Sequence, residues 1–153
     1  MKNWSKSIAA SLLFFGFSNL ALAQFTESAE DAFRQASDSG KSILLIFSGS
    51  DWCAPCMQLD KKVLSTNQFQ NFAGQELIVL KADFPQRRKI EKWLSDQNDA
   101  LAERYNPQGI FPYLVLLNPD KSSIGSLKYD FQTPEQFIEE VKAQLSKSRH
   151  GKT

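Results

Sequence analysis

The chain has 153 residues, 42% of them hydrophobic, a size typical of one domain that needs no disulfides for bulk stability. Its 18 basic and 17 acidic residues nearly cancel, so its overall charge favours neither nucleic acid nor a membrane surface as a partner. The sequence also argues against a structural zinc site, which takes four ligands, because the only histidine is His150 near the C-terminus.

The N-terminus has the three parts of a secretory signal peptide. Lys2 and Lys6 precede an apolar run from Ile8 to Phe17, and Ala-Leu-Ala at 21–23 is a small-x-small cleavage site. The run is too often interrupted by polar residues for a membrane anchor, which needs about 20 consecutive apolar residues. We therefore expect cleavage after residue 23 and a periplasmic or secreted protein without stable insertion in the membrane.

The mature chain, residues 24–153, contains no internal repeat and no low-complexity linker, which predicts a single domain. Loss of Lys2 and Lys6 lowers the 18 basic residues to 16, against 17 acidic ones, for a net charge of −1. The local exceptions are the basic residues 87–89 and the tail 146–153, which we interpret as solvated surface. We expect a monomer with no nucleic-acid partner.

The first half of the mature chain predicts a helix, a buried strand and a second helix. Residues 26–41 place three alanines and Phe33 on one helical face and end at Gly40. Residues 42–49, SILLIFSG, form a continuous apolar run with β-branched residues, which is typical of a buried strand. The next helix starts at about Cys53, and an apolar stripe faces the core. This stripe comprises Cys56, Leu59, Val63 and Leu64.

The second half predicts three strands and at least two helices. The expected elements are a strand at 76–84, one or two helices within 90–106, strands at 110–120 and 123–131 joined by a turn at 118–122, and a helix at 133–147. Asp96 or Asn98 is the expected break and N-cap within 90–106. Thr133 is the expected N-cap of the last helix, with Pro134 at its first position.

The order of these elements is α, β, α, β, α, β, β, α. Helices that connect strands are typical of parallel pairing, and a short turn between strands is typical of an antiparallel hairpin. We therefore expect an α/β fold with a central mixed sheet, parallel where helices connect the strands, antiparallel at the last hairpin, and flanked by helices on both faces.

The two cysteines, Cys53 and Cys56, lie one helical turn apart at the predicted start of a helix. Free backbone N–H groups and the helix dipole favour a thiolate there. Lowering the pKa of a thiol by about 1.5 corresponds to about 2 kcal/mol of preferential stabilisation of the anion. Cys56 lies one turn further in and should be less exposed. We therefore predict that Cys53 attacks as the nucleophile and Cys56 resolves, with Asp51 nearby opposing the pKa shift.

A structural disulfide is the alternative for this pair. Such a bridge closes a very small loop, for which the chain-entropy model predicts the least stabilisation. The spacing therefore favours redox chemistry over a structural role. We expect no metal and no cofactor.

The sequence WCAPC after a buried strand, with IFPYLVLLNPD far downstream, resembles the active-site motif and proline loop of the thioredoxin superfamily. The resemblance covers nearly all of the mature chain and is closest to secreted bacterial thioredoxin-like proteins with an SDWC-type motif. It implies a thioredoxin-like fold in which Cys53 and Cys56 form a redox-active disulfide. It also implies that Pro112 is a cis-proline facing that disulfide. Trp52, Phe111 and Pro112 would then contact the substrate.

Two features depart from the superfamily pattern. Thioredoxins carry a buried acid in the strand before the motif, and Ile46 stands at that place, so we expect no buried carboxylate base for the resolving thiol. The segment 85–97 is longer than in a minimal thioredoxin. We expect Trp93 to anchor an extra helix to the core; the alternative is that Trp93 and the basic residues 87–89 face a partner.

Two functions fit this sequence. The first is a thiol:disulfide oxidoreductase of the cell envelope acting on disulfide-containing client proteins. Ala54-Pro55 resembles the Gly-Pro of reducing thioredoxins more than the histidine-containing pairs of oxidases, which favours a reductase supplied by a membrane thiol electron donor. The second is a peptide-binding adaptor or chaperone whose disulfide stays closed.

Overall fold

The computed structural model describes residues 25–150. The predicted signal peptide, residues 1–23, lies outside the described residues, as does the end of the basic tail. Within the described part of the chain, no helix combines the length and the apolar character needed to cross a membrane.

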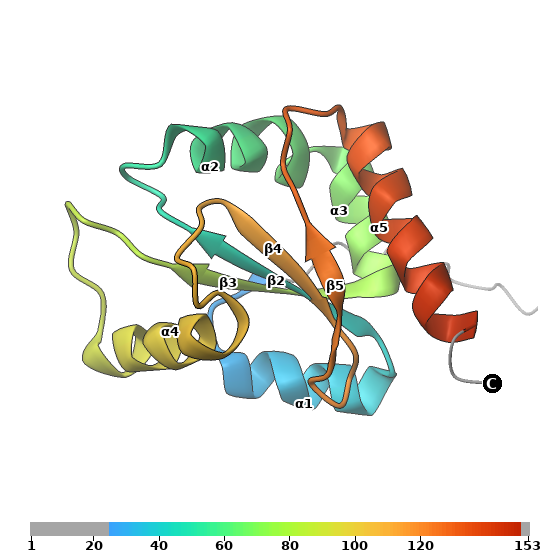
Figure 1. Cartoon of the computed structure of the whole chain (residues 1–153), viewed down its shortest axis with the longest axis horizontal. Helices are drawn as coiled ribbons and strands as arrows, with labels where there is room; N and C mark the ends of the chain where they lie inside the picture. Colours follow the sequence, from blue (N-terminus) through green and yellow to red (C-terminus); the bar gives the residue numbers. More distant parts are fainter. Residues whose placement is uncertain (1–24, 151–153) are drawn as a thin grey trace, which may run out of the picture.

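Five strands form one twisted sheet at the centre of the domain (Figure 1). They are β1 (Phe25–Thr26), β2 (Ser42–Ser48), β3 (Leu77–Asp83), β4 (Tyr113–Leu117) and β5 (Ser123–Leu127). Their spatial order is β1-β3-β2-β4-β5. The predicted mixed sheet is confirmed, and β1 is an addition, because two residues are too few to show a periodic pattern.

The direction of β4 corrects one expectation. A helix connects β3 to β4, yet β4 pairs antiparallel with β2, while β3 pairs parallel with β2. The reason is that the connection leaves the sheet after Asp83 and returns to the same end, where Tyr113 pairs with Phe47. The segment before β4 is thereby placed beside the end of β2.

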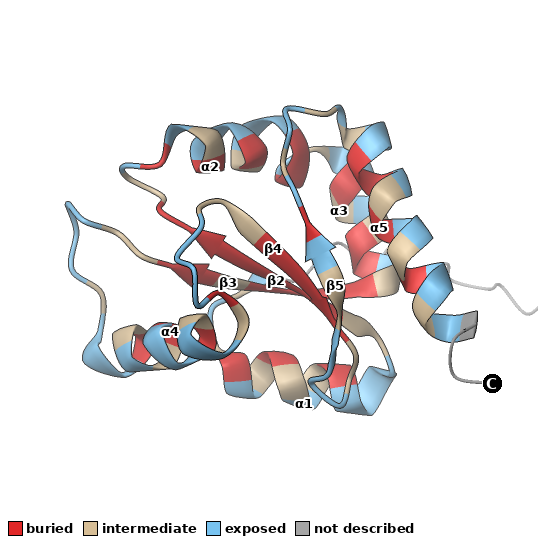
Figure 2. Ribbon diagram, viewed as in Figure 1, coloured by how far each residue is buried: buried red, intermediate tan, exposed pale blue. Residues whose placement is uncertain are grey.

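Helices cover both faces of the sheet (Figure 1). One face carries α1 (Ala29–Ser39) and α4 (Lys92–Tyr105). The other carries α2 (Ala54–Leu59), the π-helical turn η1 (Asp60–Leu64), α3 (Asn67–Glu76) and α5 (Pro134–His150). Buried residues line the inner sides of these helices and both sides of the central strands (Figure 2), and they form two apolar clusters, one on each face.

The predicted helix ends are confirmed for α1 and α5. α1 stops at Gly40, which has a left-handed φ of 72° that favours glycine. Before α5, the hydroxyl of Thr133 accepts a hydrogen bond from the backbone N–H of Gln136, and the Gln136 side chain accepts one from the N–H of Thr133. This reciprocal pair is a capping box.

The helix that begins at the cysteines is not α-helical along its whole length, in contrast to the prediction. The stripe of Cys56, Leu59, Val63 and Leu64 is buried as expected. However, α2 continues into the π-helical turn η1. The wider turn lets the adjacent residues Val63 and Leu64 both face the core.

α4 is one continuous helix, so the predicted break at Asp96 or Asn98 is wrong. Asn98 is 1% exposed in the middle of α4. Its side-chain amide donates a 2.9 Å hydrogen bond to the backbone carbonyl of Asp83 at the end of β3. The residue therefore joins α4 to the sheet instead of capping a helix.

The expectation that Trp93 anchors this helix to the core is also wrong. Trp93 is 57% exposed, while Leu94 and Leu101 are the buried apolar residues of α4. The helix is oriented so that the indole of Trp93 faces solvent and Leu94 and Leu101 face the core.

Removing the Asn98 amide should destabilise the domain. Asn98→Ala leaves the Asp83 carbonyl buried without its donor, which costs about 1–3 kcal/mol. We expect a free energy of unfolding in urea lower by that amount, whereas Asp99→Ala, at an exposed position of the same helix, should change it little. Equal unfolding free energies for the two variants would contradict this role of Asn98.

Candidate active site

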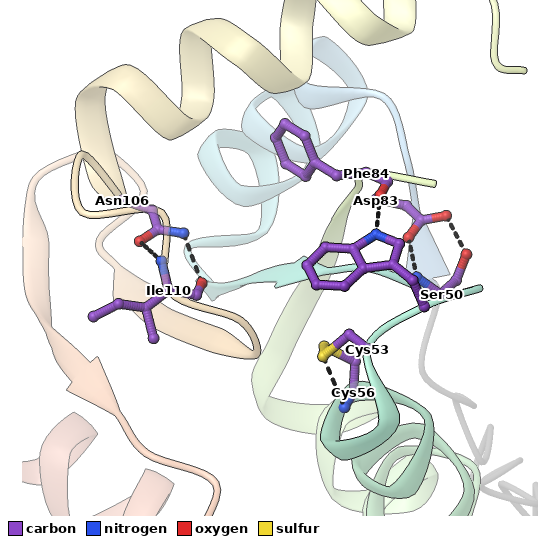
Figure 3. The surroundings of a disulfide bond; sticks show 8 residues. Ser50, Cys53, Cys56, Asp83, Phe84, Asn106 and Ile110 are labelled. Carbon is purple, nitrogen blue, oxygen red and sulfur yellow. Dashed lines mark hydrogen bonds between the residues drawn. A yellow bond between two sulfur atoms is a disulfide. The ribbon is translucent and has the colours of Figure 1, made fainter. Parts of the chain in front are cut away.

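Cys53 and Cys56 form a disulfide at the end of the sheet (Figure 3). β2 ends at Ser48, and the chain turns through a loop closed by a hydrogen bond from the N–H of Cys53 to the carbonyl of Gly49. Cys53 is the N-cap of α2, and its sulfur accepts a 3.3 Å hydrogen bond from the N–H of Cys56. The predicted helix start is confirmed, and the first sulfur lies where a backbone N–H points at it.

The two sulfurs differ less in accessibility than the sequence predicts. Cys53 is 4% exposed and Cys56 2% in the disulfide state. In this state the Cys53 sulfur faces the N–H of Cys56.

The Trp52 side chain lies in a fixed orientation next to the disulfide. Its indole N–H donates a 2.7 Å hydrogen bond to the carbonyl of Phe84. The ring lies so close to Gly49 that a Cβ there would come within 2.3 Å of it. The Trp52 ring also meets the edge of Phe111, with ring centroids 5.3 Å apart.

The proline loop lies at the same end of the sheet. The Phe111–Pro112 bond is cis, as the family resemblance implies, and Pro112 directly precedes β4. Asn106, 3% exposed, exchanges two hydrogen bonds with the backbone of Ile110 through its side-chain amide (Figure 3). This buried amide, which the sequence analysis did not single out, fixes the loop before the proline.

A second residue that the sequence analysis missed is Asp83, the last residue of β3. Its carboxylate is almost fully buried and accepts hydrogen bonds from the N–H and the hydroxyl of Ser50, at 2.9 and 2.6 Å (Figure 3). Arg88 donates to the same carboxylate and forms an ion pair with it. Asp83 therefore holds the loop that carries Cys53. A charged residue closing the apolar run LIVLKAD is the signal that points to it.

The position at which thioredoxins carry a buried acid is occupied here by a buried apolar residue. Ile46 is 1% exposed and lies in the cluster that contains Leu59 and Val63. Asp83 is a buried carboxylate at the same end of the sheet, but its hydrogen bonds go to Ser50 and Arg88. Its structural role is therefore to hold loops.

Asp51 binds the backbone of the segment that follows β3. Its carboxylate accepts hydrogen bonds from the backbone N–H groups of Gln86, Arg87 and Arg88 at 2.9, 2.8 and 3.3 Å. These bonds, led by that of Gln86, hold the pKa of the Asp51 carboxyl below its ordinary value of 3.8. The Asp51 charge, which was expected to oppose the Cys53 thiolate, therefore accepts hydrogen bonds from this segment.

Known proteins resemble this chain in sequence and in fold. The protein named disulfide bond reductase DsbH, from Chlamydia pneumoniae, is 29% identical over 119 residues, which cover 78% of this chain and 71% of that protein. A solved structure titled DsbH oxidoreductase superposes with a TM-score of 0.76 at 24% identity, covering 95% of this chain and 94% of the other. A thioredoxin from Thermus thermophilus gives 0.59 at 18% identity, covering 79% and 85%.

A thioredoxin-like family model matches residues 24–119, which is most of the chain. The matched region contains the Cys53–Cys56 disulfide and the strands β1 to β4, and β5 lies beyond it. The chain therefore belongs to the thioredoxin-like family and is a thiol:disulfide oxidoreductase.

Proposed function

We propose that this protein is a protein-disulfide reductase of the cell envelope. The observation that carries the proposal is the position of Cys53, whose sulfur caps α2 and accepts the N–H of Cys56. In the reduced protein the same donor stabilises a Cys53 thiolate, the form that attacks disulfides. The name of the DsbH relative, a disulfide bond reductase, supports this direction of electron flow.

The reaction runs in two exchange steps. The Cys53 thiolate attacks one sulfur of a client disulfide, the client S–S bond breaks, and one client thiolate leaves. Cys56, deprotonated, then attacks the Cys53 sulfur of the mixed disulfide and releases the second client thiolate. The client gains two electrons, and Cys53 and Cys56 are left as a disulfide.

Trp52, Phe111 and Pro112 are the proposed substrate contacts. The aromatic rings of Trp52 and Phe111 pack against each other, and Pro112 lacks an N–H that would compete for hydrogen bonds. A client strand laid along this loop would place its disulfide at Cys53.

The cell envelope is proposed because residues 1–23 carry the features of a cleaved signal peptide, which leaves residues 24–153 as the mature domain. In an oxidising compartment each turnover leaves the pair as a disulfide, so two electrons must be returned to it. A dithiol protein of the membrane is the class of donor that we propose for this step.

Turnover of insulin separates a reductase from a peptide-binding adaptor. With dithiothreitol as the electron source, the mature protein should accelerate insulin reduction, because the pair cycles between dithiol and disulfide. The measurement is the rate of turbidity increase, with the Cys53→Ser/Cys56→Ser double variant as the control. Identical rates for the protein and this control would favour the adaptor.

The reduction potential of the Cys53–Cys56 couple tests the direction. We expect a value nearer to the roughly −270 mV of thioredoxin than to the roughly −120 mV of the oxidant DsbA. Equilibration with glutathione or dithiothreitol buffers and thiol alkylation gives the potential. A value in the DsbA range would make the protein an oxidase.

The division of labour between the two sulfurs predicts opposite results for two single variants. Cys56→Ser keeps the nucleophile but lacks the sulfur that releases the client, so disulfide-linked complexes should accumulate in cells and disappear with dithiothreitol. Cys53→Ser should accumulate none. Non-reducing gels of envelope extracts give the result, and complexes formed only by Cys53→Ser would reverse the assigned roles.

A further inference from the structure

Among the residues whose burial the structure describes, Asp83 is the only acidic or basic one that is buried, at 3% exposure. It ends β3 on the face of the sheet that carries the cysteines. Side chains alternate along a strand, and Val79, four positions earlier, lies in the apolar cluster that contains Leu59 of α2. The exchange steps of Cys53 and Cys56 do not use the Asp83 charge.

A single peptide group lies between the Asp83 carboxylate and the backbone of Cys53. The N–H of Ser50 donates a 2.9 Å hydrogen bond to the carboxylate (Figure 3). The carbonyl of the same peptide group, that of Gly49, accepts a 2.9 Å hydrogen bond from the N–H of Cys53. Hydrogen bonds in such a chain polarise one another. The carboxylate therefore strengthens the negative end of this peptide dipole beside Cys53.

Arg88 is the counter-ion of this carboxylate, but the two charges differ in exposure. The side chain of Arg88 is 52% exposed, and that of Asp83 is 4% exposed. Water and salt screen an exposed charge more than a buried one. The cation therefore compensates the buried anion only in part, and a net negative potential remains at Cys53.

The other charges around the disulfide are paired or exposed. Asp51 accepts three backbone N–H groups, and Lys81, on the same face of β3 as Asp83, forms an ion pair with Asp60 of η1. None of these groups is buried as Asp83 is. The remaining titratable groups on neighbouring elements are Lys61, Lys62, Arg87, Lys89, Tyr113 and Tyr129.

We propose that Asp83 and Arg88 are positioning residues that set the reduction potential of the Cys53–Cys56 couple. The uncompensated part of the Asp83 charge raises the free energy of the Cys53 thiolate, so the reduced pair gives up its electrons more readily, and Arg88 limits this effect. The inference deepens the proposed function and rests on it, because a reductase needs a couple that is easily oxidised.

Exchange with glutathione measures this effect. The Cys53 thiolate and the Cys56 thiol are oxidised to the disulfide, and oxidised glutathione is reduced to two thiols. These thiols receive the Cys56 proton and one proton from water. A charge that destabilises the thiolate therefore shifts this equilibrium toward the protein disulfide.

Two single variants should move the equilibrium in opposite directions. Asp83→Asn keeps an acceptor for the N–H of Ser50 but removes the charge, so the pKa of the Cys53 thiol should fall and the equilibrium constant for oxidation should decrease by about three- to tenfold. Arg88→Gln leaves the anion uncompensated and should raise both. A change of this size is roughly 14–30 mV, since tenfold is 29.6 mV for a two-electron couple.

The equilibrium constant is measured in glutathione or dithiothreitol buffers at pH 8, and the pKa from the rate of alkylation by iodoacetamide against pH. The double variant Asp83→Asn/Arg88→Gln should return close to the unaltered protein, and Arg88→Lys, which keeps the charge, should differ little from it. The matched control is Lys89→Gln, which makes the same change in net charge at an exposed neighbouring position and should shift the constant less than Arg88→Gln.

A purely structural role gives a different pattern. Loss of the loop contacts would lower the free energy of unfolding in urea for both single variants, and the double variant would be the least stable. Shifts of the equilibrium constant in the same direction for both single variants, or no shift in either, would overturn the proposal. So would an equal shift for Lys89→Gln and Arg88→Gln.

The proposed function can fail separately, because these shifts are differences between variants. If the unaltered protein has a potential in the range of the oxidant DsbA while the single variants shift oppositely, the roles of Asp83 and Arg88 stand and the reductase is refuted. A reducing potential that neither variant moves has the reverse meaning. If Asp83→Asn slows client release from Cys53 without changing the pKa of Cys53, Asp83 is a proton acceptor for Cys56 and the proposal is wrong.

Discussion

The buried carboxylate of Asp83 is the constraint on which the active-site end of the domain depends. An ionised carboxylate removed from water costs several kcal/mol unless donors surround it. Here the donors are Ser50, in the loop that leads to Cys53, and Arg88, in the segment between β3 and α4. Two segments distant in sequence are therefore bound to one point at the end of β3. Neither can move away without leaving that charge partly unpaired, so the loop before the disulfide and the segment that contains Arg88 are fixed together.

Polar burial is concentrated at this end of the sheet. The buried polar residues in the described part of the chain are Ser48, Asp83, Asn98 and Asn106. Ser48 and Asp83 end neighbouring parallel strands and pair with each other, Asn98 bonds to the Asp83 carbonyl, and Asn106 holds the loop before the cis-proline. The rest of the interior consists of apolar clusters. Apolar packing thus supplies the rigid frame, while a few satisfied polar groups orient the loops that meet at the disulfide.

Local patterns were sufficient to predict most of the fold. The apolar run of β2, the hairpin of β4 and β5, and the cap at Thr133 each depend on residues close in sequence. What the sequence left undetermined depends on contacts between distant segments: Ser50 and Asp83 are 33 positions apart. The orientation of α4 about its own axis also depends on such contacts. Trp93 and Leu94 are adjacent at its start, so the sequence allows either residue to face the core. The cysteines and Pro112 were found because their motifs are local, and Asp83 was missed because its partner Ser50 is distant in sequence. Asn106 bonds to Ile110 only four positions on, and it was missed because no known motif contains it.

Asp51 holds residues 86–88 through their backbone, which leaves the choice of side chain at some of these positions open. The carboxylate contacts only backbone N–H groups, and every amino acid except proline has one. The side chains at positions 86 and 87 can therefore be replaced without loss of the hydrogen bonds that hold the segment. Arg88 differs, because its guanidinium also binds Asp83. The backbone of this segment is thus held independently of the side chains at positions 86 and 87. Substitutions at these two positions can therefore change the exposed surface of the segment without altering the loop that carries the disulfide.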